Sequence, residues 1–106
     1  MQDYAEAVKW YRVAAEQGMS NAQFLLDVMY SDGRGVAQDK VQAYMWVNLA
    51  AVSRSQGDEG EKSAKAREEV AQQMTPDQIA KAQRLASEWR PKTWDELKDR
   101  LETNSR

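Results

Sequence analysis

Few residues in this chain could carry out chemistry. The sequence contains neither cysteine nor histidine, so it lacks thiolate nucleophiles, imidazole bases and the usual zinc ligands. Asp27, Asp32 and Asp39 could in principle hold a divalent cation, but their spacing fits no calcium loop. We interpret these aspartates as helix caps and surface charge, and we expect neither a bound metal nor a cofactor.

Two further motifs resemble catalytic motifs, but a structural role explains each of them better. Gly33-Arg34-Gly35 lacks the additional glycine and the Lys-Ser/Thr pair that would cradle a phosphate, so we predict a turn between two helices. The adjacent carboxylates Glu68-Glu69 and Asp95-Glu96 would point about 100° apart on a helix and would share no acid–base site. We therefore expect a protein that is not an enzyme, with a small hydrolase as the less favoured alternative.

The composition indicates a folded chain with no charge-based affinity for nucleic acid. Of 106 residues, 42% are hydrophobic and 30% are charged, which is typical of globular domains. Fifteen Lys and Arg stand against 17 Asp and Glu, so no basic face is expected. No apolar run approaches the ~20 residues that span a bilayer. No signal peptide is visible after Met1, and localisation stays open between cytoplasm and periplasm.

An internal repeat is the most informative feature. Residues 7–15 read AVKWYRVAA and residues 43–51 read AYMWVNLAA, so alanine, tryptophan and an Ala-Ala pair coincide at an offset of 36 residues. A period of this size is typical of solenoids built from paired helices. Because Trp10 and Trp46 occupy equivalent positions, we expect both, together with Tyr11, to pack between helices.

Start and stop signals divide the chain into six helices. Their predicted spans are 3–18, 20–31, 39–54, 58–74, 75–89 and 93–102. The proposed N-caps are Asp3, Ser20, Asp39, Asp58, Thr75 and Thr93. Pairs such as Ser20 with Gln23 have the form of a capping box, and apolar residues recur at i, i+3, i+4 and i+7 rather than at every second position. These signals predict an all-α fold.

One stretch of the sequence resembles the Sel1-like repeats, relatives of the tetratricopeptide repeats. The matching residues are Ala22, Leu26, Met29-Tyr30, Gly33, Gly35-Val36, Asp39, Ala43, Trp46, Ala50-Ala51 and Gly57. The resemblance implies an alpha-alpha superhelix of Sel1-like helix pairs, forming a single domain over residues 1–106. Residues 3–18 would be the second helix of an incomplete repeat, 20–57 a full repeat, and 58–106 a degenerate repeat with C-terminal capping helices.

Two departures from the repeat pattern affect the packing that we expect. Asp27 stands where the family has a glycine, so this side chain should either bend outward or loosen the contact between paired helices. The chain also begins on the second helix of a repeat, which leaves the helix over residues 3–17 without its usual cover. An exposed apolar stripe there would favour self-association or helix exchange between chains.

The resemblance also suggests a binding face. In tetratricopeptide arrays the first helix of each pair lines a concave groove, which here places Asn21, Phe24, Val28 and Ser31 on one side of the helix over residues 20–31. The plainer alternative is that Phe24 and Val28 fill the core. Weaker candidates on the fourth helix are Lys62, Lys65, Glu69 and Gln72. We predict an adaptor or scaffold that binds a peptide or partner protein there, without nucleic acid or membrane insertion. The alternative is a self-associating fragment of a larger repeat protein.

Overall fold

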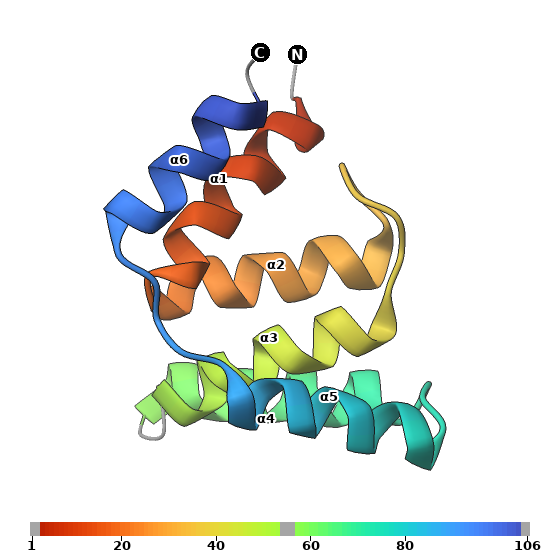
Figure 1. The fold of residues 1–106 in the computed structure, drawn as a ribbon. Helices are drawn as coiled ribbons and strands as arrows, with labels where there is room; N and C mark the ends of the chain where they lie inside the picture. The colour runs from red at the N-terminus through yellow and green to blue at the C-terminus, as the bar shows by residue number, and fades with distance from the viewer. Residues whose placement is uncertain (1–2, 54–56, 105–106) are drawn as a thin grey trace.

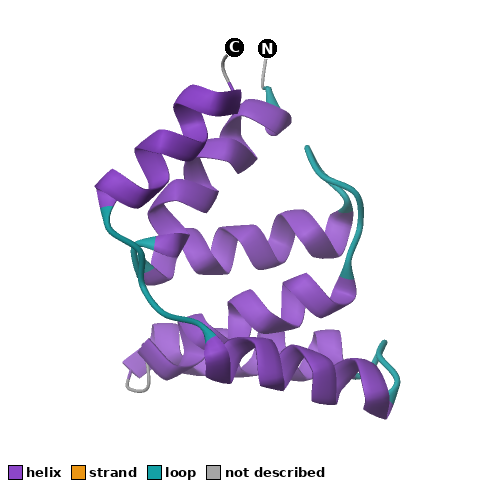
Figure 2. Ribbon diagram, in the orientation of Figure 1, coloured by secondary structure: helices purple, strands orange, loops and turns teal. Residues whose placement is uncertain are grey.

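A computed structural model describes residues 3–53 and 57–104, and its ordered elements in this part of the chain are all helices (Figures 1 and 2). The helices are α1 (Tyr4–Glu16), α2 (Ser20–Asp32), α3 (Lys40–Ser53), α4 (Gly57–Ala71), α5 (Pro76–Glu88) and α6 (Trp94–Asn104). The prediction of an all-α helical repeat is therefore confirmed.

Helix α3 is the centre of the packing. It packs against α2 on one side and against α4 and α5 on the other, while α1 packs against α2. The segment after α5 then crosses the end of α1, where the backbone N–H of Lys92 donates to the carbonyl oxygen of Glu16 at 2.7 Å. Helix α6 follows and overlaps α1 in the view of Figure 1.

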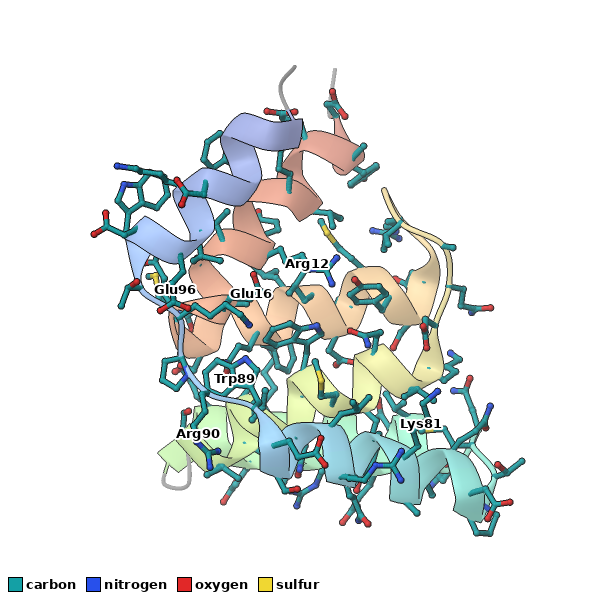
Figure 3. The ribbon with its side chains drawn as sticks, viewed as in Figure 1. Arg12, Glu16, Lys81, Trp89, Arg90 and Glu96 are labelled. Atoms are coloured by element: carbon teal, nitrogen blue, oxygen red, sulfur yellow. The ribbon has the colours of Figure 1, made fainter. Side chains whose placement is uncertain are left out.

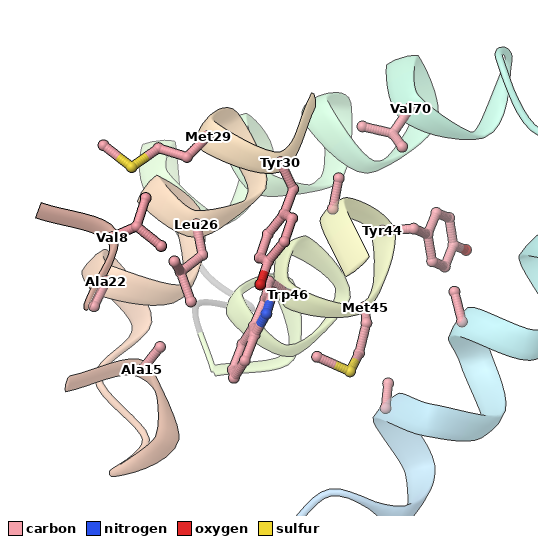
Figure 4. Close-up of a cluster of buried hydrophobic side chains, with 13 residues drawn as sticks. Val8, Ala15, Ala22, Leu26, Met29, Tyr30, Tyr44, Met45, Trp46 and Val70 are labelled. Carbon is pink, nitrogen blue, oxygen red and sulfur yellow. The ribbon is translucent and has the colours of Figure 1, made fainter. Parts of the chain in front are cut away.

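The hydrophobic core gathers around one face of α2 and most of α3 (Figure 4). Leu26, Ala43 and Ala50 are fully buried and Trp46 is 2% exposed. The Ala14-Ala15 and Ala50-Ala51 pairs lie near the ends of equivalent helices, where small side chains let neighbouring helices approach closely. The 0% exposure of Ala15 and Ala50 agrees with this role in packing.

Four of the predicted N-caps hold their helices as expected, and at α6 the Thr93 hydroxyl oxygen accepts from the backbone N–H of Glu96 at 3.4 Å. The Asp3 carboxylate accepts from the backbone N–H of Glu6, and the Asp39 carboxylate accepts from that of Gln42, each at 3.1 Å. At α5, Thr75 and Gln78 form a complete capping box. These side chains satisfy N–H groups that the first helical turn leaves without partners.

The capping box predicted at Ser20 is wrong. Helix α2 begins at Ser20 itself, and its cap, Met19, makes no side-chain hydrogen bond. Gln23, the expected partner, is 1% exposed and donates from Nε2 to the carbonyl oxygen of Ala15 at 3.1 Å. The glutamine therefore joins α2 to the end of α1 instead of capping its own helix.

The bounds of the fourth helix also differ from the prediction. Helix α4 begins at Gly57, so Asp58 belongs to its first turn, and the helix ends at Ala71 rather than at Met74. The Asp58 side chain lies outside the described residues, as does Arg54, the predicted end of the third helix.

The glycine-punctuated segment forms the predicted turn. Gly33 and Gly35 both have φ of +71°, a conformation that side chains with a Cβ rarely adopt. The N–H groups of Gly33 and Arg34 donate to the Met29 carbonyl oxygen and close the end of α2. A Cβ on Gly35 would clash with the backbone of Tyr4, so this loop packs closely against the start of α1.

The equivalent tryptophans have different environments, which contradicts the expectation for Trp10. Trp46 is buried, and the ring of Trp89 meets it edge-on with the centroids 6.5 Å apart. Trp10 is 49% exposed and its indole N–H donates to the Glu6 carboxylate at 3.0 Å. The difference arises because α3 is covered by α2, α4 and α5, whereas the extensive packing of α1 is with α2 alone. Tyr11 is half-buried.

Candidate partner-binding site

The predicted binding face lies at the edge between α2 and α4. Asn21 and Phe24 line an open hollow of about 400 Å³, together with Leu25 from α2 and with Glu59 and Lys62 from α4. We call these five residues the α2–α4 hollow. Phe24 is half-buried and also contributes to this open surface. Its position is therefore compatible with the predicted groove and with the alternative that Phe24 fills the core.

The hollow combines an apolar floor with polar edges. Leu25 is 38% exposed, and the Lys62 ammonium lies 5.5 Å from the centroid of the Phe24 ring, within the range of a cation–π contact. Asn21 is exposed at the start of the helix and offers an amide for hydrogen bonding. The arrangement can contact an apolar side chain and a polar backbone group at the same time.

The other two predicted residues do not line the hollow. Ser31 donates from its hydroxyl to the Asp27 carboxylate at 3.1 Å, and its carbonyl oxygen accepts from Gln38 at 2.8 Å and from Lys40 at 3.3 Å. Val28 is half-buried. Of the four predicted site residues, the structure brings Asn21 and Phe24 together at the hollow, and places Ser31 about two to three turns further along α2.

Sequence reasoning missed Leu25 and Glu59. The predicted stripe consists of residues spaced three and four apart, whereas Leu25 lies about 100° around the helix from Phe24. An unbroken apolar pair in the sequence, Phe24-Leu25, was the available signal. Glu59 could be placed only once the position of α4 was known. Among the weaker candidates Lys62 lines the hollow, Lys65 and Glu69 are exposed on α4, and Gln72 is exposed just after the end of α4.

Asp27 is directed into the protein, which excludes the outward orientation considered from the sequence. It is 3% exposed, one turn after Phe24 on α2. Burial away from water raises the pKa of its carboxyl to about 7. The hydrogen bond from Ser31 and the charge of Lys40 oppose that rise, while Asp32 and Glu69 add to it through like-charge repulsion. The carboxyl is thus the titratable group most strongly perturbed beside the predicted binding face.

The three aspartates considered for a metal serve separate roles. Asp27 is hydrogen-bonded to Ser31, Asp32 pairs with Arg34 at 3.7 Å, and Asp39 caps α3. Within residues 3–53 and 57–104, no three His, Cys, Asp or Glu side chains are grouped as metal ligands. Across those same residues, no helix is both long and apolar enough to cross a membrane.

A second open hollow, of about 350 Å³, lies between α3 and α5. It includes Leu49, Val52, Gln83 and Trp89, and Val52 is 70% exposed. Gln83 donates weakly to the Tyr44 hydroxyl at 3.4 Å. This surface is separate from the α2–α4 hollow and offers matched positions for control substitutions.

The surface of α1 is partly covered by the C-terminal segment. Glu16 and the chain around Trp89 and Arg90 approach each other (Figure 3), and the Lys92 ammonium lies 3.5 Å from the Glu16 carboxylate. Tyr4 remains 39% exposed and Trp10 49%. Self-association through this helix therefore stays a prediction with an exposed aromatic surface to support it.

Comparisons with known proteins agree with this architecture. The Sel1 repeat family matches residues 1–19 and 20–51. A curated relative, the exopolysaccharide production negative regulator of Rhizobium leguminosarum bv. viciae, is 49% identical over 39 residues, which are 37% of this chain and 15% of that protein.

A solved structure extends the likeness to nearly the whole chain. It is a protective antigen present in uropathogenic Escherichia coli strains and displays an SLR fold, with a TM-score of 0.74 and 32% identity. The match covers 95% of this chain and 21% of that one, so this chain spans only a small part of both proteins. The chain is therefore similar to Sel1 repeat proteins, over residues 1–51 in sequence and over nearly its whole length in helical architecture.

Proposed function

We propose that this chain is a protein-interaction module that binds a peptide or a helix of a partner protein in the α2–α4 hollow. Sel1-like repeats generally act as protein-interaction modules. The curated relative is named as a negative regulator, and binding a partner protein is one physical means by which such a protein acts. For this chain the role would be that of an adaptor or scaffold.

The observation that carries the proposal is the mixed character of the hollow. Leu25 is 38% exposed beside the half-buried Phe24, and Asn21, Glu59 and Lys62 surround them. An apolar centre with a polar rim is the usual anatomy of a protein interface. Small-molecule sites are in general more enclosed, so this open shape favours a protein ligand. Because the area is small, affinities near micromolar are expected.

The same surfaces favour a non-enzymatic role over the hydrolase alternative. A hydrolase of this size would need a nucleophile within hydrogen-bond reach of a base inside an enclosed pocket. The α2–α4 hollow and the α3–α5 hollow are both open, and the titratable groups that line them are Glu59 and Lys62. This combination suits recognition by contact and charge better than acyl transfer.

A pair of matched double variants tests the proposal. Asn21→Ala with Phe24→Ala removes one amide and one apolar side chain from the α2–α4 hollow. Gln83→Ala with Val52→Ala removes the same two kinds of group from the α3–α5 hollow. Proteins cross-linked to each variant in cells of the source organism would be quantified by mass spectrometry, and circular dichroism would verify that both variants remain helical.

The first variant should capture its most enriched partner at least tenfold less than the wild type, as expected when an anchoring aromatic is truncated. The second variant should capture that partner normally. Equal capture by both variants would place the binding surface elsewhere on the molecule.

A further inference from the structure

A third open hollow, of about 240 Å³, lies at the start of α1 and is lined by two tyrosines and a carboxylate. Its lining residues are Asp3, Tyr4, Ala7, Tyr11 and, from α2, Met29. None of them lines the α2–α4 hollow or the α3–α5 hollow. The proposed function therefore makes no use of this surface.

The spacing of residues on α1 creates the hollow. Tyr4 and Tyr11 lie seven residues apart, about two turns, so their side chains project from the same side of the helix. Ala7 lies between them and carries only a methyl group, which leaves space between the two larger side chains. Tyr4 is 39% exposed, Tyr11 is half-buried, and the buried Met29 lines the inner side. A side chain of a partner can therefore enter between the tyrosines from solvent.

The lining of this hollow has the chemistry of a cation site. Aromatic rings attract organic cations through their negative faces, and the Asp3 carboxylate adds a full negative charge. One of its oxygens accepts from the backbone N–H of Glu6 at 3.1 Å, and a carboxylate has sites for about four hydrogen bonds. The dipole of α1 opposes a cation at this end, but it is equivalent to about half a charge. Neither lysine nor arginine is among the described residues that line the hollow.

The structure already places one guanidinium against this aromatic surface. The Arg34 guanidinium lies 5.9 Å from the centroid of the Tyr4 ring, within the range of a cation–π contact, although Arg34 does not line the hollow. Asp32 lies 3.7 Å from Arg34 and offsets its charge, which reduces its repulsion of a second cation. The Tyr4 ring is thus accessible to a guanidinium and compatible with one.

We propose that this hollow binds an arginine side chain of a partner protein, with the guanidinium between Tyr4 and Tyr11 and paired with the Asp3 carboxylate. A guanidinium suits these groups better than an ammonium does. It is planar and weakly hydrated, stacks on aromatic rings, and pairs with a carboxylate through two N–H groups. Because Asp3 and Tyr4 are exposed, salt should weaken the contact.

Titration of the full chain with a capped arginine, Nα-acetylarginine methylamide, tests the site. Aromatic ¹H–¹³C NMR spectra would follow the rings of Tyr4 and Tyr11. Capped citrulline, which has a similar shape without the charge, is the matched ligand control. The test variants are Tyr4→Leu and Asp3→Asn, since asparagine caps a helix about as well as aspartate. Glu6→Gln is the matched control variant, because Glu6 is a carboxylate on the same helix that does not line the hollow.

Capped arginine should shift both rings with a dissociation constant near millimolar, as expected of one side chain binding alone, and capped citrulline should not. With the Tyr11 ring as the reporter, Tyr4→Leu and Asp3→Asn should each weaken binding about two- to fivefold. Glu6→Gln should bind like the wild type. Equal shifts with both ligands, or wild-type affinity in both test variants, would overturn the inference.

A second copy of the chain is the competing occupant. If concentrating the protein without any ligand shifts the same two rings, the hollow belongs to an interface between copies, and its assignment to an arginine of another protein is wrong. Because the probe is a single capped amino acid, each of these results is independent of whether the α2–α4 hollow binds protein.

Discussion

Replacing Asp27 with asparagine should stabilise the protein at neutral pH and leave it little changed in acid. The side chain is 3% exposed and its carboxyl has a pKa of about 7 in the folded protein, against an ordinary value of 3.8. Asparagine keeps the shape and the oxygen that accepts from Ser31, but it cannot ionise. The substitution therefore isolates the free energy of charging this one buried group.

The sign follows from proton binding. Because the folded-state pKa is raised, the folded protein binds more protons than the unfolded chain between pH 3.8 and about 7. Stability due to Asp27 is therefore complete below pH 3.8 and falls as pH rises through that interval. Each pKa unit corresponds to 1.36 kcal/mol, so the loss reaches about 4 kcal/mol near neutrality. A loss of that size is a large part of the 5–15 kcal/mol that stabilises a typical domain.

Urea unfolding monitored by circular dichroism at several pH values would measure this effect. The free energy of unfolding of Asp27→Asn minus that of the wild type should grow by about 4 kcal/mol from about pH 4 to about pH 8, and then level off. Other carboxylates titrate equally in both proteins and cancel in the difference. Parallel pH profiles would refute the reasoning, because they would mean that Asp27 titrates alike in the folded and unfolded states.

Two further predictions concern the aromatic residues. Trp46→Ala should lower the free energy of unfolding by about 3–5 kcal/mol, because it leaves a cavity against Trp89 in the core. Trp10→Ala should lower the free energy of unfolding by less than about 1 kcal/mol, because Trp10 is 49% exposed. Equal losses for the two variants in urea unfolding would disprove this asymmetry. If α1 mediates self-association, sedimentation velocity should detect dimers that Tyr4→Ser with Trp10→Ser abolishes. A strictly monomeric wild type would argue against that interface.

The sequence predicts the helices because the contacts that cap them join residues close to one another in the chain. The N–H groups that Asp3, Asp39 and Thr75 satisfy lie within three residues of each cap, so the relevant contact is encoded in adjacent sequence. The turn at Gly33 and Gly35 is similarly local, since positive φ values are a property of the backbone at those positions. The start of α2 departs from this rule because Gln23 finds a better partner in another helix.

Gln23 shows how a tertiary contact replaces a local one. Its spacing from Ser20 permits a capping box, yet its amide is buried against the carbonyl oxygen of Ala15, an acceptor at the end of α1. Most buried polar groups have a hydrogen-bond partner, and Nε2 of Gln23 finds one because this position faces another helix rather than solvent. The spacing of Ser20 and Gln23 does not show that α1 packs against this position, so the capping pattern there was misleading.

Trp10 and Trp46 show that burial also depends on tertiary packing when two residues occupy equivalent positions of a repeat. Equal positions in a repeating sequence produce equal helices, but burial depends on the neighbours that each copy has. Trp46 belongs to α3, which has helices on several sides, and Trp10 belongs to α1, which packs chiefly against α2. A repeat unit covers only the units beside it, so residues at the margin of the array remain exposed despite their core-like pattern.

The sequence predicts only the part of the binding face that comes from a single helix. The stripe containing Asn21 and Phe24 is a property of α2 alone and could be read from helical spacing. The contribution of Glu59 and Lys62 depends on where α4 crosses, which is set by packing on α3. Asp27 depends on packing in the same way: it lies outside that stripe, and the rise in its pKa comes from burial and from charges on α3 and α4 that the sequence of α2 does not contain.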